Sequence, residues 1–457
     1  MKNENNSVND QPEEKLLSQS KIQSVVFYTN TADDALAVLR LLGPADHLGL
    51  RVIRGVENGL VHVDKVREGD IVVLQRDFCR DLDSYTQIIE LAHKLEKPVV
   101  FDLDDLLFEL PENHPDRICS YYADALLPML LAIMEADLVT VTTPGLRDYL
   151  FPYNENIVVI PNYLNDNLWT LKEPPFSAQE NEKISIGYMG GHTHTPDLIM
   201  VLPALERIIK KYPDKVQFQF WGIEPPTELL PYSHVDWYPP KSSDYADFAS
   251  YFQTQTADIM IAPLCDTLFN SCKSPIKYLE YSAIGVPGVY SNVAPYLGII
   301  EDCEDGFIAS STEEWGAFLS KLIEDQELRK KIALNAHQKI KKDWLLSQNA
   351  ERQFNFYMDA VTNYGKYKHN YPTFYAFMKS MNRQTFDGNR HNIQLIEENK
   401  NTIKSLLDEL EEDNRQNQLL ANQLDQSKEE IITYALSKSW QLTRPFRKLS
   451  RKFKRGA

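Results

Sequence analysis

Short apolar segments alternate with helical segments along most of this chain, and the alternation occurs in two separate series. The strands of a parallel sheet are buried on both faces and are joined by helices that cover those faces, so this pattern predicts α/β domains. A chain of 457 residues with 43% apolar residues can supply the cores of two such domains. We expect two Rossmann-like domains whose carboxyl strand ends face a shared cleft, where open α/β sheets bind ligands.

The two series set the expected domain boundaries. The first covers residues 24–170 and the second covers residues 184–345. Residues 171–183 between them are rich in proline and charged residues, which is typical of a linker. Residues 1–23 are dominated by polar side chains and are predicted to be disordered. Helices over residues 346–390 are expected to pack back across the domains.

A heptad pattern of apolar residues follows in residues 391–436. It predicts a helical coiled-coil extension, and Asn417 at one a position is the kind of polar residue that fixes register and strand number. We therefore expect self-association through this segment; the alternative is an amphipathic helix folded onto the body of the protein. The a positions are Ile396, Ile403, Leu410, Asn417, Leu424 and Ile431.

The final residues, 437–457, carry many Lys and Arg side chains, no Asp or Glu, and interspersed aromatic residues. A basic amphipathic segment of this kind is suited to an anionic membrane surface. The alternatives are a solvated basic tail and a tail that docks on the acidic body.

Composition excludes several classes of protein. The net charge of −17 argues against nucleic-acid binding, which needs a basic surface. The N-terminus lacks the apolar core of a signal peptide, and the longest apolar run, residues 125–134, is too short to cross a bilayer. Five cysteines without a CxxC pair fit free thiols in a reducing compartment. We expect a cytoplasmic protein, peripheral at the inner face of the cell membrane.

Residues 269–289 read as a loop, a helix, a tight turn and a strand. Ser274 is predicted to cap the helix, and Gly285 is predicted to close it in the left-handed conformation. Lys273 and Lys277 lie at the start of this helix, where free backbone N–H groups favour anions. The stretch therefore has the features of an anion site.

Glu280, one turn further along the same helix, is placed to accept hydrogen bonds from sugar hydroxyls. Lys277 and Glu280 are three residues apart and share a helix face. The competing interpretation is an ordinary surface helix with a Lys–Glu pair.

A glycine turn opens the second series. Gly190 and Gly191 follow a predicted strand, and glycines at a strand end let backbone amides approach phosphates closely. The pattern is not GxGxxG, so it does not indicate a dinucleotide cofactor, and we expect no cofactor. His192 and His194 form an HxH pair, but without a cluster of further ligands we expect substrate-facing or capping histidines and no metal.

The sequence FDLDD places Asp102 and Asp104 at the end of a first-series strand. Carboxylates there can act as a base, bind Mg²⁺ or cap the following helix. We keep both as candidate catalytic residues.

In this order, the glycine turn, the sequence KYLEYSAIGVPGV and the runs ADLVTVTTPGLRDYL and IVVIPNYL resemble the group 1 (family 4-like) glycosyltransferases of the GT-B fold. The resemblance covers roughly residues 24–350. It implies transfer of a sugar from a nucleoside-diphosphate sugar to an acceptor, with retention of anomeric configuration and without a metal. The donor would bind the second domain and the acceptor the first.

The resemblance also implies roles for particular residues. Glu280 matches the second of two motif glutamates, which binds the donor ribose, whereas Cys272 stands where the first glutamate is expected. The basic residue that the resemblance implies after the glycine turn is absent, because Gly191 and His192 occupy that place. Lys273 and Lys277 would supply the missing positive charge and neutralise the departing diphosphate. The donor-binding set is Gly190, Gly191, His192, His194, Ser274 and Glu280, and the catalytic set is Lys273, Lys277, Asp102 and Asp104.

The function that this reading predicts is a retaining glycosyltransferase acting on a glycan or lipid-linked acceptor in surface polysaccharide or glycoconjugate biosynthesis. The alternatives are a sugar-nucleotide epimerase on the same fold and a non-catalytic GT-B scaffold that assembles through its coiled coil.

Overall fold

The computed structural model describes residues 22–31, 33–174, 183–232, 234–362, 364 and 372–436. It divides into two units, one ending at Arg383 and one beginning at Gln384, which we describe separately. The predictions for residues 1–21, for most of the linker and for the basic tail fall outside the described residues.

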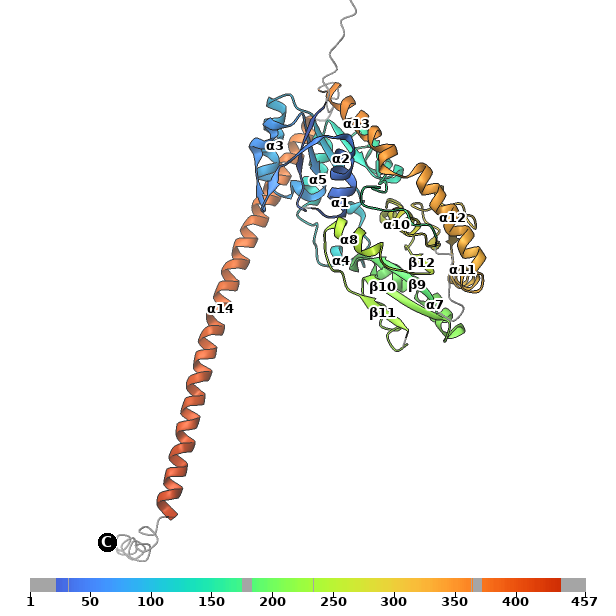
Figure 1. Cartoon of the computed structure of the whole chain (residues 1–457). Coiled ribbons are helices and arrows are strands. Elements are labelled where there is room, and N and C mark those ends of the chain that lie inside the picture. Colours follow the sequence, from blue (N-terminus) through green and yellow to red (C-terminus); the bar gives the residue numbers. More distant parts are fainter. Residues whose placement is uncertain are drawn as a thin grey trace, which may run out of the picture. The chain divides into compact units, whose positions relative to one another are not determined.

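The first unit contains two six-stranded sheets in which every strand pair is parallel (Figure 1). The first sheet has the order β2-β1-β5-β6-β7-β8. Its strands are β1 (Ser24–Tyr28), β2 (Arg51–Arg54), β5 (Ile71–Gln75), β6 (Val99–Leu103), β7 (Leu138–Val141) and β8 (Ile157–Val159). A small antiparallel hairpin, β3 (Val56–Glu57) and β4 (Leu60–Val61), follows β2.

Helices connect these parallel strands. After β1 a π-helical turn, η1, lies between two short α-helices, and π turns of this kind recur at functional sites. The helices are α1 (Ala35–Ala37), η1 (Val38–Leu42), α2 (Gly43–Leu48), α3 (Leu82–Lys94), α4 (Pro115–Ile118), α5 (Leu126–Glu135) and α6 (Pro144–Leu150).

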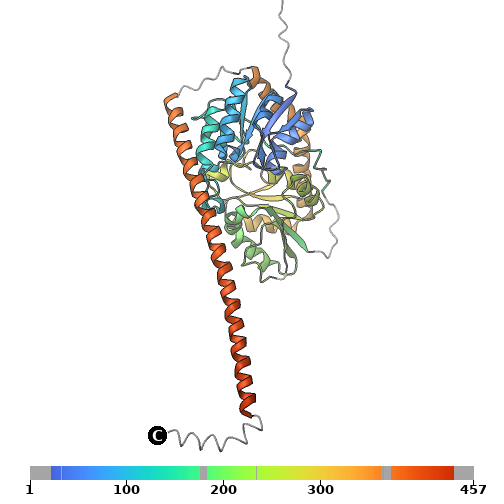
Figure 2. The ribbon, with the colours of Figure 1, turned by 90° about the vertical axis from the view of Figure 1, so that its left-hand side faces the viewer.

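The second sheet has the order β11-β10-β9-β12-β13-β14 and forms a separate domain in both views (Figure 1, Figure 2). Its strands are β9 (Ile184–Gly190), β10 (Val216–Gly222), β11 (Val235–Tyr238), β12 (Ile259–Ala262), β13 (Gly288–Ser291) and β14 (Phe307–Ala309). Its helices are α7 (Thr195–Lys211), α8 (Tyr245–Phe252), α9 (Leu268–Ser271), α10 (Ile276–Ala283), α11 (Thr312–Glu324) and α12 (Gln326–Asp343).

Each face of the second sheet packs into its own apolar core. Phe218 and Phe220 of β10 lie in one core, and the next residue, Trp221, lies in the other. Successive side chains of a strand point to opposite faces, and both faces here are covered by helices. This is why the strands read as continuous apolar runs in the sequence.

The chain crosses between the two domains twice. After β8 it passes to the second domain, and after α12 it returns as α13 (Leu346–Thr362), whose Tyr357 and Ala360 join the apolar core of the first sheet. An isolated parallel bridge between Leu164 and Leu345 joins the outgoing and returning segments. The first domain is therefore completed by a helix from beyond the second.

A long helix, α14 (Pro372–Leu436), ends the described chain. Within the second unit its apolar seam residues are exposed, from 52% for Ile396 to 68% for Ile431. None of the helices in the described part of the chain is both long enough and apolar enough to cross a membrane. The prediction of two Rossmann-like sheets followed by a long C-terminal helix is confirmed.

Candidate functional site

A cleft of about 890 Å³ opens at the carboxyl ends of β9 and β10, beside the start of α10. Ala35 and Leu39 of the first domain also line it, so both domains contribute to its wall. Six of the residues predicted for the site lie along this cleft: Gly190, Gly191, His192, His194, Lys277 and Glu280.

The glycine turn lies where β9 ends. A Cβ atom at Gly190 would lie 2.6 Å from the Tyr188 hydroxyl, so a larger residue here would have to displace the buried Tyr188 ring. Gly191 has open space around it, with no atom within 4 Å of a Cβ built there. A short turn, η5 (His192–His194), then leads into α7. The backbone beside Gly191 is therefore open to a ligand, as phosphate binding by main-chain amides requires.

Lys277, His194 and Asp197 form a chain of hydrogen bonds at the edge of the cleft. The Lys277 ammonium donates to Nε2 of His194 (3.0 Å), and Nδ1 of His194 is 2.8 Å from Oδ2 of Asp197. His194 must then be neutral and donate its Nδ1–H to the carboxylate. The other oxygen of Asp197 accepts from the Cys265 amide (2.7 Å) and the Asn270 side chain (3.1 Å). Asp197 thus ties the histidine turn to the loop that precedes α10.

The pKa values of Lys277 and His194 agree with a neutral His194. Burial, followed by the nearby Lys277 ammonium, lowers the pKa of His194 to about 4, so the ring is neutral at pH 7. Burial and the neighbouring Lys273 ammonium lower the pKa of Lys277 to about 8. Lys277 is therefore a cation at pH 7 that has given up much of its hydration, and an anion in the cleft would restore the lost stabilisation.

Glu280 lies on the same helix face and is buried, with 3% of its surface exposed. The Tyr245 hydroxyl donates to its Oε1 (2.8 Å), and the Trp169 indole N–H donates in turn to that hydroxyl (3.2 Å). Burial raises the pKa of the Glu280 carboxyl to about 7. Tyr245 and Trp169 fix the orientation of this carboxyl group, and no sequence pattern pointed to either of them.

The ends of helix α10 differ in part from the prediction. Gly285 has φ +76° after the last turn, so the predicted left-handed closure is confirmed. The predicted Ser274 cap is wrong: Pro275 is the N-cap residue, and no side chain caps this end. The Ser274 hydroxyl instead accepts from the side chain of Asn162 in the first domain (3.2 Å).

Lys273 does not line the large cleft. Its ammonium is 3.6 Å from Oδ2 of Asp105 and lies over the Phe269 ring, 4.4 Å from the centroid. It lines a smaller cavity of about 80 Å³, together with His114 and His194. Lys273 and Lys277, which were predicted to act at one site, therefore line two different cavities, and His194 lines both of them.

The two candidate aspartates occupy different surroundings. Asp102 is enclosed inside the first domain, where it pairs with Arg40 at 2.8 Å. Asp104 lies 3.6 Å from Arg76, and its Oδ1 is buried without a hydrogen-bond partner. Burial raises the pKa of the Asp104 carboxyl to about 6. Of the two, Asp104 has the properties of a group that can exchange a proton near neutral pH.

Cys272, which stands at the position of the missing glutamate, is part of the domain interface. Its side chain is buried, and its carbonyl oxygen accepts from the Thr143 hydroxyl of the first domain (2.8 Å). Burial raises the pKa of its thiol to about 11, so it stays protonated. All five cysteines are free thiols.

The ring of His194 is engaged by other side chains. Both ring nitrogens of His194 have protein partners. Among the residues that the structure describes, no group of three or more His, Cys, Asp or Glu side chains is arranged to hold a metal ion.

Three residues that contact predicted site residues are absent from the set predicted from the sequence: Asp197, Tyr245 and Arg40. Asp197 follows His194 by three residues at a helix start, a spacing that places both side chains on one face and that would have indicated the pair. Tyr245 and Arg40 carry no such local pattern, because their partners lie 35 and 62 residues away.

No protein-family model and no curated protein sequence matches this chain. Solved structures do match. The structure of HepE from Anabaena in complex with UDP-glucose has a TM-score of 0.52 at 13% identity, covering 74% of this chain and 100% of HepE. Sucrose-phosphate synthase from Thermosynechococcus elongatus also has a TM-score of 0.52 at 13% identity, covering 74% of this chain and 99% of that one. The chain therefore has the GT-B fold, and the predicted resemblance is confirmed at the level of the fold.

Proposed function

We propose that this chain is a retaining glycosyltransferase that moves a sugar from a nucleoside-diphosphate sugar to a glycan or lipid-linked acceptor. The observation that carries the proposal is the juxtaposition of a desolvated lysine, a glycine turn and a buried carboxyl group along one cleft. A nucleoside diphosphate has complementary groups: an anionic diphosphate and a ribose with two hydroxyls. The UDP-glucose in the HepE structure of the same fold is consistent with this donor class.

The roles on the donor side follow from the chemistry of each group. Backbone amides at Gly190 and Gly191 and the Lys277 ammonium bind the diphosphate. Glu280, oriented by Tyr245, accepts hydrogen bonds from the ribose hydroxyls. As the bond between the anomeric carbon and the phosphate oxygen breaks, negative charge collects on the diphosphate, and Lys277 stabilises it electrostatically.

The acceptor side rests on Asp104. An acceptor hydroxyl forms the new bond to the anomeric carbon and must lose its proton. The Asp104 carboxylate, ionised above pH about 6, is suited to accept that proton. Lys273 pairs with Asp105 at 3.6 Å, which holds the tip of this aspartate loop against the donor domain. Asp102, buried against Arg40, has no proposed contact with the substrates.

A donor panel tests the proposal. UDP, GDP, ADP and TDP and their sugars are added to the full chain, and the melting temperature is followed. A ligand at one hundred times its Kd stabilises the folded protein by about 2.7 kcal/mol.

The best donor is then incubated with and without candidate acceptors. Nucleotide release with a new glycosidic product supports transfer, and conversion of the sugar nucleotide alone identifies an epimerase. Failure of every nucleotide to bind would favour a non-catalytic scaffold, a reading that the Cys272 replacement keeps open.

The affinity for nucleotide should fall both at acidic and at alkaline pH, giving the pH profile an acidic and an alkaline limb. Below pH about 7 Glu280 gains a proton and loses acceptor capacity, and above pH about 8 Lys277 loses its charge. The charged groups that influence Lys277 are Lys273, Asp197, Glu280 and Asp105. We expect UDP to bind about tenfold more weakly at pH 9 than at pH 7.5, as measured by isothermal titration calorimetry. Lys277→Arg, which stays charged, should remove the alkaline limb; an unchanged limb in that variant would assign it to another group.

We also propose that α14 mediates self-association. Its seam residues in residues 391–436 are exposed, and a parallel, in-register pairing would bring Asn417 against its own copy. Sedimentation equilibrium should show an oligomer that Leu410→Glu and Leu424→Glu together dissociate. The matched control is Glu411→Leu, a change beside the seam that should leave the mass unchanged. A wild-type monomer at micromolar concentration would refute this proposal.

Membrane contact through residues 437–457, and with it a cytoplasmic location at the membrane, remains a proposal from the sequence.

A further inference from the structure

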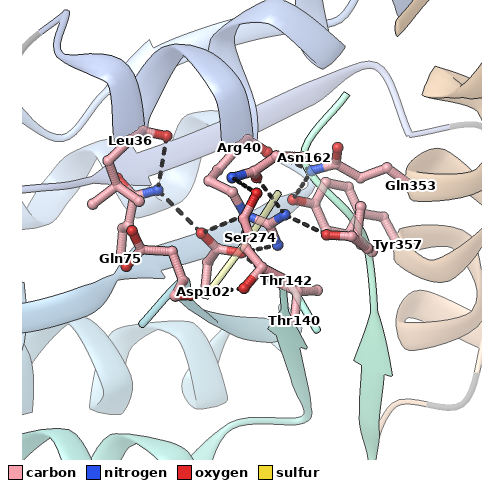
Figure 3. A network of polar contacts seen from close by, with 12 residues as sticks. Leu36, Arg40, Gln75, Asp102, Thr140, Thr142, Asn162, Ser274, Gln353 and Tyr357 are labelled. Atoms are coloured by element: carbon pink, nitrogen blue, oxygen red, sulfur yellow. Dashed lines mark hydrogen bonds and ion pairs between the residues drawn. The ribbon is translucent and has the colours of Figure 1, made fainter. Parts of the chain in front are cut away.

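The side chain of Arg40 is buried at the centre of a polar network that joins parts of the chain far apart in sequence (Figure 3). Arg40 lies in the π-helical turn η1, with its side chain 1% exposed. Its Nη2 donates to Oδ1 of Asp102 at 2.8 Å, and its Nε lies 3.2 Å and 3.3 Å from the two Asp102 oxygens. Gln75 (3.1 Å) and Thr140 (2.6 Å) also donate to this carboxylate. Asp102 is thus fully engaged by the protein itself.

Both connections between the domains attach to Arg40. On the outgoing connection, Nη1 donates to the Ile160 carbonyl and to Oδ1 of Asn162 (3.2 Å). On the returning helix α13, the Gln353 side chain donates to the Arg40 carbonyl (2.7 Å) and also contacts the Tyr357 hydroxyl (2.9 Å). The one residue therefore fixes the place where the chain leaves the first domain and the place where it comes back.

The network extends to the start of helix α10 through a single amide. Asn162 accepts from Arg40 with its oxygen and donates with its nitrogen to the Ser274 hydroxyl (3.2 Å). Ser274 immediately precedes Pro275, which starts the helix that carries Lys277 and Glu280. Because helix α10 has no side-chain cap of its own, its first turn depends on contacts made outside the helix.

We propose that Arg40, Asp102 and Asn162 are positioning residues that fix the start of helix α10, and with it Lys277 and Glu280, relative to the first domain. Asp102 orients the guanidinium, the guanidinium orients the Asn162 amide, and the amide holds Ser274. The π turn places Arg40 where its guanidinium contacts Asp102 and Asn162 at once. The expected effect on nucleotide affinity rests on the proposed function. The dependence of the start of helix α10 on Asn162 does not.

The test compares two asparagines in the full-length chain. Asn162→Ala removes the link to Ser274. Asn154→Ala is the matched control: Asn154 is also a buried residue of the first domain, 5% exposed against 7%, and its amide donates to the Ile133 and Ala136 carbonyls (2.8 and 2.9 Å). Amide hydrogen exchange is followed at Tyr278 and Leu279, whose N–H groups both bond to the Pro275 carbonyl.

We expect exchange at these two amides, without nucleotide, to be about fivefold faster in Asn162→Ala than in the control. UDP should also bind about five- to tenfold more weakly to that variant, because a smaller fraction of molecules holds the competent helix start. If Asn162→Ala does not fold, Ser274→Ala removes the same hydrogen bond from its other end and is expected to raise the same exchange rates.

Equal exchange rates in the two asparagine variants would overturn the positioning role. If wild-type protein binds no UDP, the exchange experiment still decides whether the coupling exists, so failure of the proposed function and failure of this inference give different results.

Discussion

Replacing Lys277 by methionine should abolish most turnover while leaving the protein folded. The buried ammonium faces the cleft and is proposed to stabilise the charge that develops on the departing diphosphate. Removing one such group from an enzyme typically costs a factor of about 10² to 10³ in kcat. We expect a loss of that size in initial rates at saturating donor, together with weaker binding of UDP.

The same substitution should not lower stability by much. Burial depresses the pKa of Lys277 from 10.5 to about 8, which means that the folded protein disfavours the charged form. An apolar side chain of similar length removes that cost, although it also leaves Nε2 of His194 without its donor. Lost activity at unchanged or raised melting temperature is the signature of a residue kept for function.

Lys339→Met is the matched control. Lys339 pairs with the buried Asp305 at 2.7 Å in the same domain and does not line the cleft. This variant should keep its kcat and lose some stability, the opposite of Lys277→Met. Wild-type kcat in Lys277→Met would remove this lysine from the proposed mechanism.

Asp102→Ala should destabilise the first domain by about 3 to 5 kcal/mol. The substitution leaves the Arg40 guanidinium buried without its countercharge, and breaking a buried pair from one side has an effect of that size. It should appear as a lower midpoint of urea unfolding of the full chain, followed by far-ultraviolet circular dichroism.

Asp33→Ala provides a comparison within the same domain. Asp33 also pairs with an arginine, Arg54, but the two side chains are 51% and 33% exposed. A surface pair of this kind contributes at most about 1 kcal/mol. Equal, small effects for Asp33→Ala and Asp102→Ala would show that the Arg40 pair is solvated in solution. Replacing both members, as in Arg40→Met with Asp102→Leu, should recover part of the loss, because apolar groups fill the site without an unpaired charge.

Local patterns were enough for the fold class and for the order of strands and helices. The strands are apolar runs because helices cover both faces of each sheet. A run such as residues 71–74 can be recognised in the sequence without knowledge of its neighbours. Gly285 was predictable for a similar reason, since a left-handed residue after a helix is governed by the backbone of that residue alone.

The predicted Ser274 cap failed because a competing partner was not visible in the sequence. A serine before a helix can bond to the helix N–H groups or to another group that folding brings near it. Asn162, 112 residues earlier in the chain, is that other group. Asp102 shows the same effect. FDLDD puts a carboxylate at a strand end, but only packing decides that Arg40 encloses Asp102 and that Oδ1 of Asp104 faces Arg76 at 3.6 Å without a hydrogen bond.

The sequence by itself determined that the chain forms two parallel α/β domains and a heptad helix, and which glycines, lysines and glutamate lie at strand and helix ends. These features depend on periodicity and on the conformational limits of single residues, which are local. Only the tertiary structure decided that Lys277 bonds to His194, that Lys273 turns to Asp105, and that both domain connections meet at Arg40. Those contacts join residues far apart in sequence, and their energies depend on burial, which exists only once the chain has folded.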